Sequence, residues 1–87
     1  MDIKIASEVI KKLNKEFSSH DFIFKLLEMY PKEYGQYLLD YGYVNSADGA
    51  ISIFLVNHVK ALKIKKKGNA PSENILRNIT DCATWSK

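Results

Sequence analysis

Five lysines occupy eight positions between Lys60 and Lys67, with no acidic residue among them. Ammonium groups at this density suit the binding of phosphates, because each engaged phosphate releases a condensed counterion. On a regular helix Lys60, Lys63 and Lys67 share one face, and Lys66 lies beside it. The sequence therefore predicts a nucleic-acid-binding patch of Lys60, Lys63, Lys66 and Lys67, which Arg77 and the basic first helix could extend.

The same lysines also suit the end of a helix. Cations in a last turn complement the negative pole of the helix dipole by about 0.3–1 kcal/mol each, and Gly68 stands where a capping glycine is common. No acid precedes any of these lysines by three or four residues, so they repel one another instead of forming intrahelical pairs. This lack of pairing favours an external anionic partner, either nucleic acid or an acidic protein.

A second candidate surface is rich in tyrosine. Residues 28–43 contain five tyrosines and three acids, and four of the tyrosines recur at helical spacing. We expect these rings to pack around Leu38 with their hydroxyls in water. The alternative is a protein-binding surface, because tyrosine offers a large contact area at a low entropy cost. The tyrosines of this predicted protein interface are Tyr30, Tyr34, Tyr37, Tyr41 and Tyr43.

A third candidate is an apolar stripe on the predicted fourth helix. Ile53, Val56 and Ile64 fall on the lysine side of the helical wheel, opposite the stripe expected to face the core. A helix that is apolar on two faces is either central in a bundle or part of an interface. The stripe therefore predicts either burial within the domain or a protein interface, such as the seam of a homodimer.

The residues that usually perform catalysis or bind metals are scattered along the chain. His20 and His58 have no partner at the spacing of a zinc-binding helix, and Cys82 lies among apolar residues. The glycines form no phosphate-binding loop. We therefore expect no catalytic site, no metal site and no cofactor.

Composition indicates the class of protein. The chain has 87 residues, of which 46% are hydrophobic and 26% charged, and a net charge of +3, which predicts one globular domain over residues 1–87. A single cysteine and the lack of a signal-peptide pattern favour a reduced, cytoplasmic location. The apolar runs are too short for a membrane span, so we expect no membrane partner.

Helical periodicity covers most of the chain. Ser18 and Asp21 have the spacing of a capping box, and Pro31 suits the first turn of a new helix. Residues 42–49 are rich in turn formers and predict a loop. The predicted helices span 3–17, about 18–30, 31–41, about 50–67 and a last stretch from about 72.

These elements predict an all-α fold, a compact single-domain bundle of about five short helices. The alternative is a winged-helix-like domain, because Leu62 to Lys65 alternate with the period of a strand, and a lysine-rich strand after helices resembles a wing. Such a strand needs a partner, for which residues 42–47 or 51–56 are the candidates. Together the observations predict a small non-enzymatic regulatory module that binds nucleic acid or, alternatively, a protein-binding adaptor or inhibitor.

Overall fold

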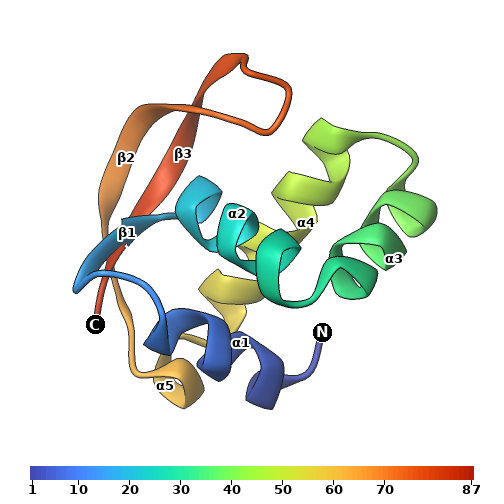
Figure 1. Cartoon of the computed structure of the whole chain (residues 1–87). Helices are drawn as coiled ribbons and strands as arrows, with labels where there is room; N and C mark the ends of the chain where they lie inside the picture. The colour runs from blue at the N-terminus through green and yellow to red at the C-terminus, as the bar shows by residue number, and fades with distance from the viewer.

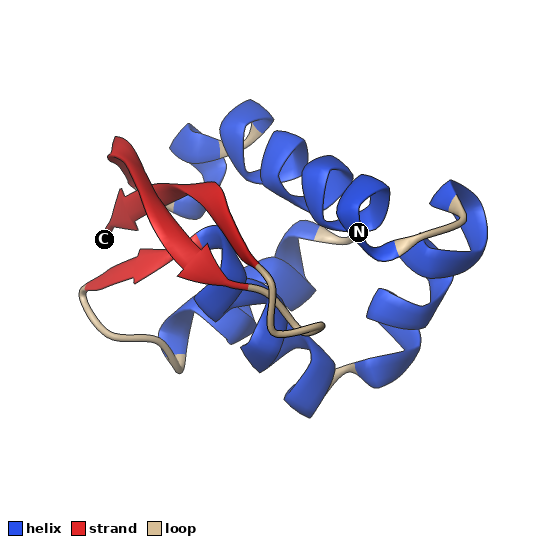
Figure 2. Cartoon of the chain, turned by 90° about the horizontal axis from the view of Figure 1, so that it is seen from above, coloured by secondary structure: helices blue, strands red, loops and turns tan.

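The protein folds into five helices and a three-stranded antiparallel sheet, so the all-α expectation is wrong. The computed structural model describes all 87 residues. The strands lie to one side of the helices, and the last two strands form a long hairpin (Figure 1, Figure 2). The elements are α1 (Ile3–Lys11), β1 (Glu16–Ser18), α2 (Ser19–Met29), α3 (Pro31–Tyr41), α4 (Val44–Asn57), α5 (Val59–Leu62), β2 (Lys65–Glu73) and β3 (Ile79–Ser86).

The first helix is shorter than its apolar pattern predicts. Asp2 caps α1, because its Oδ1 accepts a hydrogen bond from the backbone N–H of Lys4 at 2.7 Å. The helix ends at Lys11, and Phe17, which was expected on its last turn, lies in β1 opposite Trp85. Phe17 is buried in the strand as it would have been on the helix, so apolar spacing did not separate the two arrangements.

Two local signals for helix starts are confirmed. The Oγ of Ser18 accepts from the backbone N–H of Asp21 at 3.0 Å, and the Ser18 N–H donates to the Asp21 carboxylate at 2.9 Å, which is the predicted capping box. Pro31 begins α3, whose bounds match the prediction of residues 31–41. Proline fits there because a first-turn N–H has no intrahelical partner to lose.

The predicted loop at residues 42–49 is mostly helix. Gly42 ends α3 with a φ of 87°, a left-handed conformation that glycine adopts without strain, and α4 begins two residues later. Ala47 and Asp48 are buried, so tertiary packing holds the first turns of α4 despite their turn-forming composition. At the other end His58 interrupts the helix, and its Nδ1 lies 2.8 Å from the Phe54 carbonyl oxygen.

The helix predicted through the lysines ends at Leu62. Lys63 adopts a left-handed conformation, with φ 58° and ψ 44°, and terminates α5 before the chain enters β2. The expected lysine face of one helix therefore does not exist. The winged-helix-like alternative expected a strand over Leu62 to Lys65, whereas β2 begins only at Lys65. Its expected partner strands are wrong as well, because residues 42–47 and 51–56 lie largely within α4.

The last predicted helix, from about residue 72, is instead β3, the central strand of the sheet. The strand order is β1-β3-β2, and both pairings are antiparallel. A bulge between Lys66 and Gly68 shifts the register of β2. Asn74 closes the hairpin, because its Oδ1 accepts from the N–H groups of Leu76 and Asn78 at 2.9 and 3.1 Å.

The core lies between the sheet and the helices. Trp85, on β3, is fully buried. Around it pack apolar side chains from α1, β1, α2, α4, α5 and the segment that follows α5, among them Val9, Phe22, Ile51 and Leu62. None of the helices combines the length and the apolar character required to cross a bilayer.

Candidate functional site

Lysines from three stretches of the chain gather at one end of the protein. There α1 and α5 lie next to each other (Figure 1), and Lys11, Lys63 and Lys87 line a shallow hollow between them and the end of the chain. The backbone N–H of Lys87 donates to the carbonyl of Lys15 at 2.9 Å, which extends the pairing of β1 with β3 by one residue. We call this surface the basic end and define it by Lys11, Lys15, Lys60, Lys63, Lys65 and Lys87.

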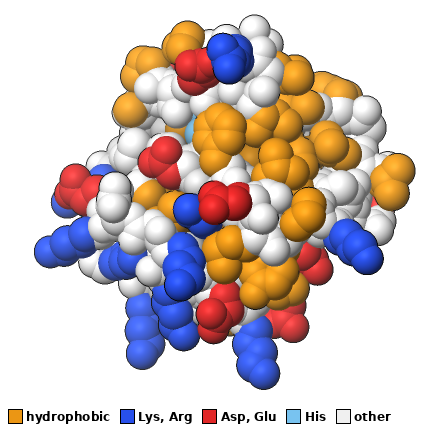
Figure 3. All heavy atoms as spheres, in the orientation of Figure 1, with side chains coloured by type: hydrophobic (Ala, Val, Ile, Leu, Met, Phe, Trp, Pro, Cys, Tyr) orange, Lys and Arg blue, Asp and Glu red, His pale blue; other side chains and the backbone are white.

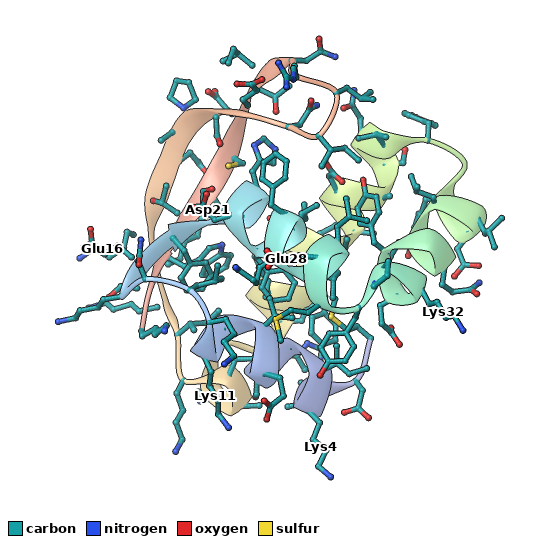
Figure 4. The ribbon with its side chains drawn as sticks, in the orientation of Figure 1. Lys4, Lys11, Glu16, Asp21, Glu28 and Lys32 are labelled. Carbon is teal, nitrogen blue, oxygen red and sulfur yellow. The ribbon has the colours of Figure 1, made fainter.

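Little negative charge offsets the basic end. Its six lysines are exposed, and only Lys11 forms an ion pair, with Glu8 at 3.4 Å. Figure 3 shows Lys and Arg side chains crowded at the lower left, around α1 and the start of the sheet. Figure 4 shows Lys4 and Lys11 extending from α1 away from the body of the protein. Like charges held this close raise the local potential and attract a polyanion.

The structure divides the lysine patch predicted from sequence. Lys60 and Lys63 belong to the basic end, whereas Lys66 lines a separate cleft between α4 and the hairpin. Lys67 lines a hollow that also contains two acids, from β1 and α2. Arg77 lies in the turn of the hairpin, at the far end of the strands.

Sequence reasoning found the basic end only in part. The basic character of the first helix pointed to Lys11 and Lys15, which do lie there. Lys87 reaches the site because β3 pairs with β1, about 70 residues away in the sequence, and no local pattern signals that pairing. Lys65 would turn toward the core on a continuous helix, but it lies in a strand and is exposed.

The five tyrosines do not form one surface. Tyr34 is 1% exposed and its hydroxyl donates to Asp48 Oδ1 at 2.8 Å, so it is a core residue that no partner can reach. Tyr30 and Tyr37 pack partly buried against the core. Tyr41 and Tyr43 are exposed, and together with Leu39, which is 80% exposed, they leave apolar surface at the junction of α3 and α4.

The apolar stripe predicted on the fourth helix is also divided. Ile64 is 7% exposed and belongs to the core, because the chain has left the helix before reaching it. Ile53 and Val56 are exposed on α4, at 61% and 46%. Central burial of this helix face is therefore wrong, and only these two residues remain available for an interface.

A polar cleft of about 400 Å³ lies between the start of α2, α4 and the β2–β3 hairpin. Four segments that are distant in sequence contribute to it, and most of its lining is polar. Its lining includes the side chains of His20, Asn45, Asp48, Lys66, Asn69 and Asp81. Sequence analysis did not indicate this cleft, because its walls meet only through the sheet and the α2–α4 contact.

Buried polar groups form the floor of the polar cleft. Burial raises the pKa of Asp48 above its usual value, although the Tyr34 hydroxyl and the nearby His20 both oppose the rise. Burial, followed by the hydrogen bond to Asp48, raises the pKa of Tyr34. The hydrogen bond from the Tyr34 hydroxyl to the Asp48 carboxylate therefore joins α3 to α4.

A second buried contact joins the sheet to the helices. The indole Nε1 of Trp85 donates to Ser19 Oγ at 3.0 Å, and that oxygen lies 3.1 Å from Ser52 Oγ. His20, only 5% exposed, has its Nε2 3.5 Å from Thr80 Oγ1, while its Nδ1 has no hydrogen-bond partner. An unsatisfied buried nitrogen is uncommon and costs about 1–3 kcal/mol.

The structure contains no group of three or more His, Cys, Asp or Glu side chains placed to hold a metal ion. Cys82 is a free thiol, half-buried on β3 in the wall of the polar cleft. Comparisons of the chain with models of protein families, with curated proteins and with solved structures find no match.

Proposed function

We propose that the protein is a non-enzymatic module that binds nucleic acid, and that the basic end contacts its phosphates. The observation that carries this proposal is the convergence of six exposed lysines from three stretches of the chain, of which one has an acidic partner. Lysines that only complemented a helix dipole would stay near one helix end. Here α1, α5, β2 and the end of β3 all contribute.

The strength of the site should depend on salt. Each phosphate neutralised by a lysine releases counterions, so the logarithm of the binding constant falls by about 0.9 per contact for each decade of salt on duplex DNA. The contacts carry no sequence information, so the basic end supplies affinity and position and leaves base discrimination to other residues.

The test removes three charges from the basic end. In the Lys60→Gln, Lys63→Gln, Lys65→Gln variant, binding to duplex DNA and to RNA should weaken for all sequences, and the salt slope should flatten by roughly two to three units. The measurement is fluorescence anisotropy across a salt series. The fold should survive, because all three side chains are exposed.

A matched control removes the same charge elsewhere. Lys25→Gln, Lys32→Gln, Arg77→Gln changes three cations outside the basic end, and its salt slope should stay close to that of the wild type. Equal slopes for both triple variants would show that net charge, and not the basic end, drives binding. Absence of wild-type binding to any nucleic acid at low salt would refute the proposal.

A second candidate function is protein binding at the junction of α3 and α4. The supporting observation is the exposure of Leu39 and Tyr43, at 80% and 64%, in a part of the surface where Figure 3 shows hydrophobic side chains. Exposed apolar and tyrosine side chains are typical of interaction surfaces. Capture of partners from host extract with and without nuclease separates this function from the first, because only protein contacts survive nuclease.

A further inference from the structure

The polar cleft has the size and shape of a site for a small ligand. Its volume of about 400 Å³ lies within the range of about 300–1,000 Å³ that is usual for such sites. The cleft is concave and bounded by a helix on one side and a hairpin on the other, so the side of a duplex does not fit into it. A single unstacked nucleotide does.

The lining carries both signs of charge. Lys66 brings a cation and Asp81 a carboxylate, and neither forms an ion pair within the protein. Asn45 and Asn69 are exposed, and their amides make no hydrogen bond to other protein groups. Carboxylates disfavour a phosphate, whereas amide, carboxylate and ammonium groups together match the donors and acceptors on the edges of bases.

His20 in the wall of the cleft carries an unmet hydrogen-bonding group. His20 is only 5% exposed in the wall of the cleft, and its Nδ1 has no hydrogen-bond partner. Its other nitrogen makes only the 3.5 Å contact to Thr80. Because the Nδ1 atom is itself buried, a ligand in the cleft would contact the exposed lining groups and not this nitrogen.

The cleft adjoins the basic end through β2. Lys65, in the basic end, and Lys66, in the cleft, are consecutive residues of this strand. Successive side chains of a strand point to opposite faces, at a rise of about 3.3 Å per residue. Because β2 is an edge strand, a nucleic acid held at Lys65 can bend around this edge of the sheet to reach Lys66 at the cleft.

We infer that the polar cleft receives an unpaired base of the nucleic acid whose phosphates the basic end holds, with Asn45 and Asn69 contacting the edge of the base. This inference rests on the proposed function and makes the ligand single-stranded DNA or RNA, or an unpaired position in a folded RNA. Recognition of RNA commonly uses such splayed bases.

The test compares single strands with duplexes. At equal length and salt, the wild type should bind labelled single strands more tightly than blunt duplexes. The Asn45→Ala, Asn69→Ala variant should lose roughly tenfold or more of its affinity for single strands, while its duplex affinity and its salt slope stay unchanged. Both asparagines are exposed, so a thermal melt should show an intact fold.

The control changes two exposed asparagines outside the cleft. Asn14→Ala, Asn57→Ala should bind single strands as the wild type does. A second measurement follows backbone amide NMR signals during titration with nucleoside monophosphates, which should shift residues of the cleft, Thr80 among them.

Three results would overturn the inference: equal wild-type binding to single strands and duplexes, unchanged single-strand binding by the Asn45, Asn69 variant, or no cleft signals shifted by the monophosphates. If the lysine triple variant still loses binding in any of these cases, the proposed function stands and only the cleft assignment fails. If no nucleic acid binds at all, both fail.

Discussion

Asp48 makes the stability of the fold depend on pH. Its carboxyl is 9% exposed on α4 and accepts a hydrogen bond from Tyr34, and burial holds its pKa above the ordinary value. Because the folded pKa is the higher one, the protonated form favours the folded state. That contribution is complete below the unfolded pKa of about 3.9 and is lost as the pH rises through the folded pKa.

Replacing Asp48 by Asn should remove the free-energy cost of burying a charged carboxylate, which depends on pH. Asp48→Asn keeps an oxygen that can accept from Tyr34 but carries no charge, so its free energy of unfolding should exceed that of the wild type at neutral pH. The difference should shrink as the pH falls through the raised folded pKa, and it should be smallest below the unfolded value of about 3.9. Urea unfolding over a pH series measures it. The control is Asp81→Asn, at an exposed aspartate of the same cleft, whose free energy of unfolding should follow that of the wild type over the pH series. If the plots of this free energy against pH are parallel for Asp48→Asn and the wild type, the pH dependence does not come from Asp48.

Lys63 stores backbone strain where α5 ends. Its φ of 58° is left-handed, which costs a residue with a side chain about 1–2 kcal/mol compared with glycine. Lys63→Gly should therefore raise the free energy of unfolding by about 1 kcal/mol and the melting temperature by about 4–8 °C. Lys60→Gly, inside α5, should instead lower stability by about 0.5–1 kcal/mol. Thermal melts in which both glycines destabilise would place Lys63 outside the left-handed region.

At the scale of elements, β3 connects the parts of the molecule. It pairs with β1 on one side and β2 on the other, and Trp85 on this strand reaches across to α2. Strand pairing alone would leave a sheet with one exposed apolar face, which is unstable in water. The indole closes that face against the helices and so orders both the basic end and the polar cleft.

Two substitutions separate the packing of Trp85 from its hydrogen bond. Trp85→Ala should lower the free energy of unfolding by about 3–5 kcal/mol, a large share of the total for a small domain. Trp85→Phe retains most of the ring volume and should cost less, chiefly through the lost bond to Ser19 Oγ, which is worth about 0.5–1.5 kcal/mol. Denaturant unfolding measures both. An unchanged midpoint for Trp85→Ala would mean that β3 does not dock on the helices as described.

The whole molecule is divided into regions of different chemistry. The basic end occupies the α1–α5 side and the start of the sheet, whereas exposed apolar side chains cluster at the α3–α4 junction (Figure 3). Electrostatic attraction at one surface and apolar contact at another can serve two partners independently, because neither surface shares residues with the other.

This separation predicts independent loss of the two kinds of binding. Leu39→Glu, Tyr43→Glu should abolish nuclease-resistant capture of any protein partner while leaving nucleic-acid affinity within about threefold, since both residues lie outside the basic end. Stability should change by less than about 0.5 kcal/mol per substitution, because both side chains are largely exposed. The measurements are capture from host extract and anisotropy. Weakened nucleic-acid binding far beyond that range would show that the two surfaces act together.

The features readable from sequence are those controlled by near neighbours. The capping box at Ser18 and Asp21 and the helix starting at Pro31 depend on residues at most three positions apart, and the structure contains both. Composition likewise suggests that the lysine run prefers anionic partners, and this preference stays a prediction until binding is measured. Trp85 ends an apolar series in the sequence, and so large a ring has few stable positions other than the core, where the structure places it.

Contacts between distant segments produced the rest. Residues 79–86 carry apolar side chains at spacings that fit a helix, and they form a strand because β1 and β2 supply hydrogen-bond partners on both sides. The turn formers before Ile51 became helix because Ala47 and Asp48 could be buried against neighbouring helices. The basic end and the polar cleft unite residues up to about 70 positions apart, and local periodicity contains no information about such pairings. Composition supplied the lysines, and the pairing of strands determined which of them lie together.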